Sequence, residues 1–161
     1  MRLDAYTHYI PAKFLERMNK VAGDHKDIGK RMRGIPAIYD LDVRRKVIDQ
    51  FKDKDYAQII SYAMPPIEHF AKGAEILEYL KLINDGFVEL CDQHKDYFPG
   101  WIAQVSLAIP EESIKETERA LKAALAGRNR ADAGHGYFPG KNEDRHERAH
   151  AVHIHEQDQR R

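Results

Sequence analysis

Strand-like and helix-like segments alternate along the first 125 residues of this chain. Short apolar or alternating runs predict strands at residues 2–9, 56–63 and 101–108. Apolar residues recur at helical spacing between and after these runs, most regularly over residues 68–93. The alternation favours right-handed βαβ units, so the predicted fold class is α/β with about three βα units around a parallel sheet.

Single residues predict where helices begin and which face they bury. Pro11 suits the first turn of a helix after the first strand, and Asp40 suits the N-cap of the next one. Residues 23–39, between these two helices, read as a loop over the mouth of a site. Pro110 opens a further helix whose inner stripe is predicted to hold Ile114, Thr117, Leu121 and Leu125.

Composition changes near Gly127, because residues 127–161 hold five of the nine histidines and few aliphatic residues. The burial of so few apolar side chains cannot offset the conformational entropy that the segment would lose on folding. We therefore predict an ordered part at 1–126 and a disordered, histidine-rich tail at 127–161. The tail is either a natural extension or the product of a reading-frame change. Its histidines are also candidate ligands for zinc, nickel or copper.

Charge and cysteine content exclude several classes of partner. The 26 basic and 26 acidic residues balance, so we expect neither nucleic acid nor an anionic membrane as a partner. One cysteine, Cys91, allows no internal disulfide and fits a reducing compartment. With no apolar run long enough to cross a bilayer, the expected location is the cytoplasm.

The first predicted strand carries the strongest indication of chemistry. Tyr6 and His8 are two residues apart, so both side chains would face the same site on a strand. Neutral imidazole is a good zinc ligand, and a phenol is a weaker one because its pKa is about 10. Asp4 either anchors a ligand from behind or caps the strand. His8 could instead be an ordinary hydrogen-bonded histidine.

Asp4-x-Tyr6-x-His8 resembles the Asp-x-His-x-His motif of the amidohydrolase superfamily, in the branch of aminocarboxymuconate-semialdehyde decarboxylase. The resemblance covers residues 1–125 and extends over Ile10-Pro11, Asp40–Arg45, Ile59–Ser61 with Pro65-Pro66, and His94–Gly100. It implies part of a TIM-like (β/α)₈ barrel, since 161 residues are fewer than the about 250 that a complete barrel needs.

The resemblance also implies a function. It predicts a metal-dependent decarboxylase (carboxy-lyase) or hydrolase that acts on a small carboxylated ring or semialdehyde, with zinc as the cofactor. His8 and Tyr6 would bind the metal, Met64 would line the substrate pocket and Arg33 would pair with the substrate carboxylate.

Later strands supply further ligands in that family, so negligible turnover is expected of this chain by itself. The alternative is a non-catalytic α/β fragment with a metal-binding tail. An unpaired edge at the third strand, with Ile102, Val105 and Leu107, predicts self-association.

Overall fold

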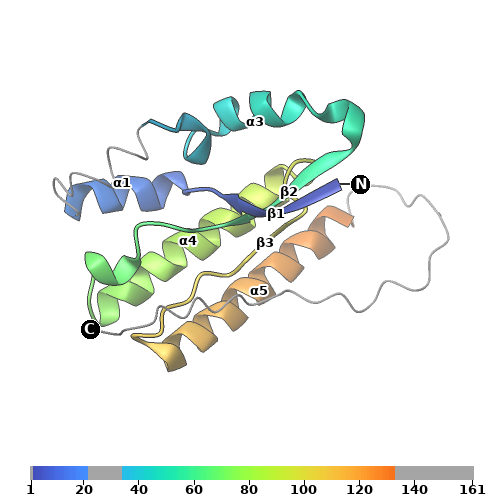
Figure 1. The fold of residues 1–161 in the computed structure, drawn as a ribbon. Coiled ribbons are helices and arrows are strands. Elements are labelled where there is room, and N and C mark those ends of the chain that lie inside the picture. The colour runs from blue at the N-terminus through green and yellow to red at the C-terminus, as the bar shows by residue number, and fades with distance from the viewer. Residues whose placement is uncertain (1, 22–33, 133–161) are drawn as a thin grey trace.

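Three parallel strands form the sheet of the computed structural model, which describes residues 2–21 and 34–132 (Figure 1). The strands are β1 (Arg2–His8), β2 (Tyr56–Ser61) and β3 (Gly100–Trp101), in the order β1-β2-β3. Both strand pairs are parallel, which confirms the predicted α/β class. The predicted loop over residues 23–39 lies largely outside the described residues, and Arg33 lies outside them with it.

Helices connect the strands and pack against the sheet (Figure 1). Asp40 caps one of them as predicted, because its carboxylate accepts hydrogen bonds from the N–H groups of Asp42 (3.0 Å) and Val43 (3.1 Å). None of the helices in the described ranges is long and apolar enough to cross a membrane. The helices are α1 (Ala12–Val21), α3 (Leu41–Asp49), α4 (Ala74–Gln93) and α5 (Pro110–Asp132), with single turns η1 (Pro36–Ile38), η2 (Lys52–Lys54) and η3 (Ile67–His69).

Aromatic side chains dominate the core between the sheet and its helices. Phe14 of α1 packs edge-to-face on Tyr62 and Tyr79, with ring centroids 5.0 and 5.7 Å apart. Phe87 of α4 contacts Trp101 of β3 with the two rings tilted, their centroids 6.3 Å apart. Burying a large apolar side chain fully contributes about 1.5–3 kcal/mol, so this cluster holds α1 and α4 to the sheet.

A β-bulge in β1 decides which way its side chains point. Asp4 pairs with Gln58 and Thr7 pairs with Ile60, so two residues of β1 lie opposite the single residue Ile59. Gln58 and Ile60 share the helix-covered face of β2. Asp4 and Thr7 therefore share that face although they are three residues apart.

The third strand is much shorter than the predicted range 101–108. One more ladder bond follows Trp101, from the N–H of Ile102 to the carbonyl of Ile60 (2.9 Å). Two residues later the backbone of Gln104 bonds to the side chain of Asn84 instead of to a strand. Because the Asn84 side chain takes the place of a strand partner here, the predicted strand at residues 101–108 is wrong beyond its first residues.

Two helix predictions also need correction. The helix predicted at residues 68–93 begins at Ala74, because η3 comes first and Gly73 has a positive φ of 55°. The predicted inner stripe of α5 was wrong for Ile114 and Leu125, which are exposed, and is confirmed for Thr117, which is buried. Helix α5 also runs to Asp132, beyond the predicted boundary at residue 127, and residues 133–161 lie outside the described ones.

Candidate functional site

The carboxyl ends of β1 and β2 bring His8 and Ser61 together. The two residues are direct neighbours in the parallel ladder, and His8 Nδ1 lies 2.8 Å from Ser61 Oγ. The Ser61 hydroxyl also donates to the carbonyl of Thr7 (2.9 Å). Active sites of α/β proteins form at this end of parallel strands, so the His8–Ser61 pair is the candidate site.

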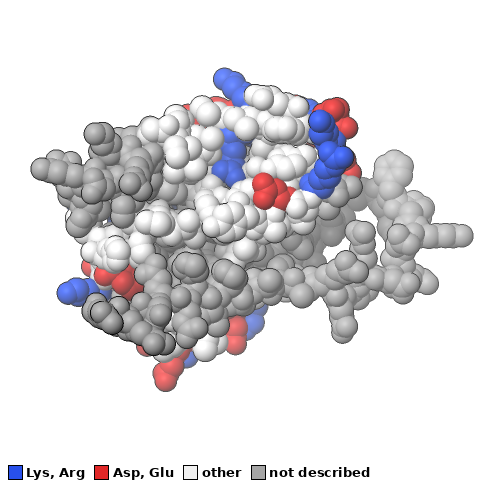
Figure 2. All heavy atoms as spheres, in the orientation of Figure 1, with Lys and Arg blue, Asp and Glu red and all other residues white. Residues whose placement is uncertain are grey.

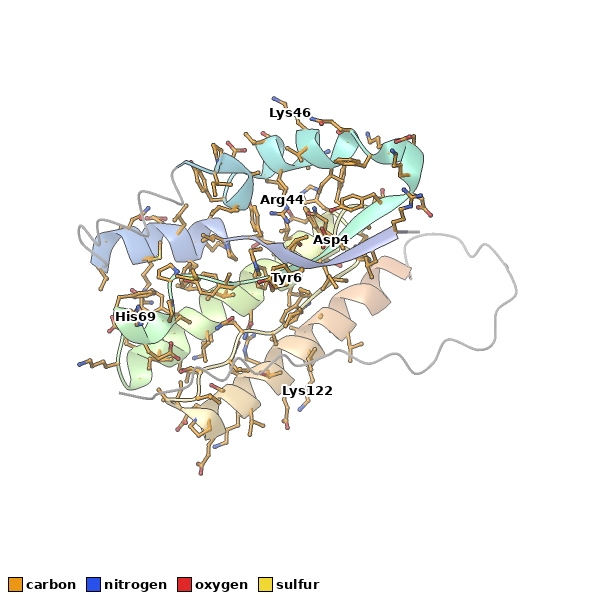
Figure 3. All side chains as sticks on the ribbon, viewed as in Figure 1. Asp4, Tyr6, Arg44, Lys46, His69 and Lys122 are labelled. Atoms are coloured by element: carbon orange, nitrogen blue, oxygen red, sulfur yellow. The ribbon has the colours of Figure 1, made fainter. Side chains whose placement is uncertain are left out.

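Arg44 of α3 fixes the end of β1 from the helix-covered side (Figure 3). It is buried, and its Nη1 donates to the carbonyls of His8 (2.7 Å) and Ala37 (3.2 Å). Its Nε donates to the side chain of Gln58 (2.9 Å). A cation at this position therefore holds the backbone of His8 rather than its ring.

The surroundings of His8 favour the neutral form of its ring. Partial burial, followed in size by the charge of Arg44, lowers the pKa of the imidazole below its ordinary value of 6.5. A lowered pKa means that the ring loses its proton more readily near neutral pH. Neutral imidazole can bind a metal ion or accept a proton, whereas imidazolium can do neither.

Tyr6 lies beside His8 as the strand pattern predicted. The two rings are edge-to-face with centroids 5.0 Å apart, and the Tyr6 side chain is 85% exposed. Asp4 was expected on the same face as His8, but the bulge places it on the opposite, helix-covered face. There its carboxylate accepts hydrogen bonds from the hydroxyl of Tyr56 (2.9 Å) and the N–H of Tyr6 (3.0 Å).

The structure describes only one of the two residues predicted to line the substrate pocket. Met64 follows β2 at the same end of the sheet and is 51% exposed. Arg33 lies outside the described residues.

The side chains near His8 do not complete a metal site. A catalytic zinc ion needs about three protein ligands and one open position. Residues 2–21 and 34–132 contain no group of three or more histidine, cysteine, aspartate or glutamate side chains placed to hold a metal ion. His8 and Tyr6 alone therefore do not fit a resident zinc ion.

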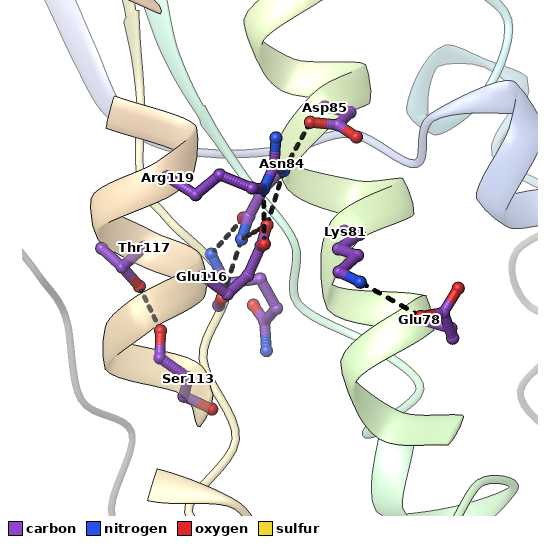
Figure 4. Close-up of polar contacts among 9 residues, drawn as sticks. Glu78, Lys81, Asn84, Asp85, Ser113, Glu116, Thr117 and Arg119 are labelled. Atoms are coloured by element: carbon purple, nitrogen blue, oxygen red, sulfur yellow. Dashed lines mark hydrogen bonds and ion pairs between the residues drawn. The ribbon is translucent and has the colours of Figure 1, made fainter. Parts of the chain in front are cut away.

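Buried polar side chains fix the segment that follows β3 (Figure 4). Asn84 Oδ1 accepts from the N–H of Gln104 (2.8 Å), and its Nδ2 donates to the carbonyl of Gln104 (3.2 Å). The same Nδ2 donates to Glu116 (3.3 Å), whose buried carboxylate forms an ion pair with Arg119 (2.7 Å). Asn84 thus takes the place of a neighbouring strand.

A second group of hydroxyls shapes the turn into α5. Ser106 is buried and donates to the carboxylate of Glu68, and its N–H donates to the hydroxyl of Ser113 (3.0 Å). Together with the Asn84 contacts, these bonds carry the chain from β3 past the carboxyl end of the sheet. They were not predicted, because no local pattern marks a serine or asparagine whose partner is 20 to 38 residues away.

Two cavities lie at the other end of the sheet. One of about 370 Å³ is bordered by Arg45 and residues 92–97, and one of about 300 Å³ is bordered by Cys91, Pro99 and Trp101 among others. Both adjoin the segment that enters β3, away from His8. Acidic and basic side chains are interspersed over the face seen in Figure 2, as the balanced charge leads one to expect.

Comparison with known proteins adds no relationship. No family model matches the chain, and no curated protein matches it significantly.

Proposed function

We propose that this chain forms the amino-terminal βα units of an amidohydrolase-like (β/α)₈ barrel. The activity would be metal-dependent decarboxylation or hydrolysis of a small carboxylated ring or semialdehyde, in the cytoplasm. One observation carries the proposal: a histidine at the carboxyl end of β1 whose Nδ1 is hydrogen-bonded to Ser61, which leaves Nε2 for a ligand. Burial also lowers the pKa of this ring, which favours the neutral form that binds metals. The consecutive strand order β1-β2-β3 supports it, because barrel units follow one another in this way.

The role proposed for His8 is that of one zinc ligand among several. Its remaining partners would come from further strands or from residues outside 2–21 and 34–132, since the described residues lack them. The exposed side chains of Leu107 (57%) and Ile114 (62%) flank the segment beyond β3, where another βα unit would pack. The expected consequence is that the 161-residue chain alone has negligible turnover.

Zinc titration of the purified chain, followed by NMR of the histidine rings, tests the ligand role. We expect zinc to shift the ring resonances of His8 and the shift to be lost in His8→Ala. His69→Ala is the matched control, because His69 is exposed and lies on η3 rather than at a strand end. Zinc that shifts only the histidines of residues 127–161 would instead support the metal-binding tail.

A turnover assay tests the expectation that the 161-residue chain alone is inactive. The substrate is a carboxylated aromatic compound, supplied with zinc and with the purified chain. We expect no rate above the zinc-only background. Zinc-dependent turnover that His8→Ala abolishes would show that the chain completes its own site, and the inactivity part of the proposal would be wrong.

A further inference from the structure

The Ser61 hydroxyl lies between two groups that constrain its single proton. Its oxygen is 2.8 Å from His8 Nδ1 and 2.9 Å from the carbonyl oxygen of Thr7. A carbonyl oxygen can only accept, so the hydrogen bond to Thr7 requires that the hydroxyl proton points to the Thr7 carbonyl. Ser61 Oγ is then an acceptor toward the ring, and Nδ1 must carry a proton that it donates.

We propose that Ser61 is a positioning residue that fixes the tautomer of His8, with the proton on Nδ1 and the lone pair on Nε2. A neutral histidine side chain free in water prefers the opposite arrangement, with the proton on Nε2. The hydrogen bond at one ring nitrogen determines what the other nitrogen can do. Ser61 therefore prepares Nε2 to bind an electrophile.

The surrounding backbone keeps this geometry in place. His8 and Ser61 are ladder partners, and the next residue, Tyr9, donates its N–H to the carbonyl of Ser61 (2.9 Å). The Thr7 hydroxyl donates to the carbonyl of Ile59 (2.8 Å) and ties the same two strands from the other face. The acceptor that orients the Ser61 proton is thus itself part of the β1–β2 pairing.

The consequence for metal binding rests on the proposed function. A zinc ion meets an available lone pair only at Nε2, so the ligand atom would be Nε2 and not Nδ1. Removing a residue that orients a metal-binding histidine typically weakens metal binding about 10–100-fold. We expect a loss of that order in Ser61→Ala only where further ligands complete the site, since the described residues do not hold a zinc ion by themselves.

The direct test reads the tautomer without any metal. Long-range ¹H–¹⁵N correlation spectra of the ¹⁵N-labelled, metal-free chain at pH 8 distinguish a protonated ring nitrogen from an unprotonated one. His8→Gln identifies the His8 signals among those of the nine histidines. We expect a protonated Nδ1 in the wild type and a shift of the proton toward Nε2 in Ser61→Ala.

Thr7→Val is the matched control. It also removes one hydroxyl hydrogen bond between β1 and β2, but it keeps the Thr7 carbonyl and the Ser61–His8 contact. We expect it to retain the protonated Nδ1, as we do for Ser61→Thr, which retains a hydroxyl. A shift of equal size in Thr7→Val would show that strand pairing, rather than the Ser61 hydroxyl, sets the tautomer.

The remaining outcomes separate the two proposals. A protonated Nε2 in the wild-type chain would overturn the role of Ser61 even if Ser61→Ala failed to fold. An unchanged tautomer in folded Ser61→Ala would overturn it as well. If the tautomers behave as expected and zinc leaves His8 unshifted, the role of Ser61 stands and the proposed metal site fails.

Discussion

Asn84→Ala should be among the most destabilising single changes in the described part of the chain. Asn84 is fully buried, and its side chain satisfies both the N–H and the carbonyl of Gln104. An unsatisfied buried polar group costs about 1–3 kcal/mol. Gln104 is half-buried, so water replaces part of what is lost, and we expect unfolding free energy to fall by about 2–4 kcal/mol.

Urea unfolding followed by circular dichroism measures this loss, with the slope against denaturant checked for constancy. Asp85→Ala is the control from the neighbouring position. It removes an exposed ion pair, in which the Asp85 side chain is 58% exposed and the Arg119 side chain 42%. Exposed pairs of this kind contribute about 0–1 kcal/mol. If both variants lost the same small amount, the Asn84 side chain would not be replacing a strand, and the reasoning would be refuted.

Three further outcomes are expected. Asp40→Ala, which removes the N-cap of α3, should lower the unfolding free energy by about 1 kcal/mol in the same urea assay. The hydrogen bond from Tyr97 lowers the pKa of Asp49 below its ordinary value of 3.8. Its contribution to stability is therefore fully present above pH 3.8 and is lost as the pH falls through the lowered pKa. Tyr97→Phe should therefore cost more stability at pH 7 than at pH 2.5, and a pH-independent cost would contradict this. Light scattering should show wild-type self-association that Leu107→Lys reduces, because Leu107 is an exposed apolar side chain in the turn before α5, not on a strand edge as the sequence predicted. A monodisperse wild-type monomer at high concentration would count against this.

Local sequence patterns were sufficient for the parts of the fold whose interactions are local. The first two strands begin where the pattern places them, at residues 2 and 56, and end two residues early at most. The Asp40 cap needed only the residue type and the apolar spacing that follows it. Parallel pairing followed from the alternation of strands and helices, because a helical connection returns the chain to the same end of the sheet.

Contacts between distant residues account for what sequence patterns missed. The third strand ends early because Asn84, on α4, accepts the hydrogen bond from the backbone N–H of Gln104 that a neighbouring strand would otherwise accept. Helix α5 buries the carboxylate of Glu116, which a hydrophobic pattern assigns to the surface, because Asn84 and Arg119 satisfy it. Neither pairing leaves a trace in the local periodicity.

The sequence pattern predicted some residues of the candidate site correctly and missed others. Two-residue spacing correctly placed the rings of Tyr6 and His8 side by side. The same rule gave the wrong face for Asp4, since one extra residue in β1 reverses the alternation. Ser61 was missed as a partner of His8, because a serine at the end of an apolar strand is unremarkable until its neighbour in the ladder is known.

The bulge in β1 gives this strand a tolerance that a regular strand lacks. Deleting one residue from a regular strand turns every side chain beyond the deletion to the other face. Here Ala5 and Tyr6 together lie opposite Ile59, so a deletion of Ala5 would restore a one-to-one ladder. Asp4 would still point toward the helices, and His8 would still meet Ser61. Related chains could thus differ in length at this point while keeping the same histidine at the end of the strand.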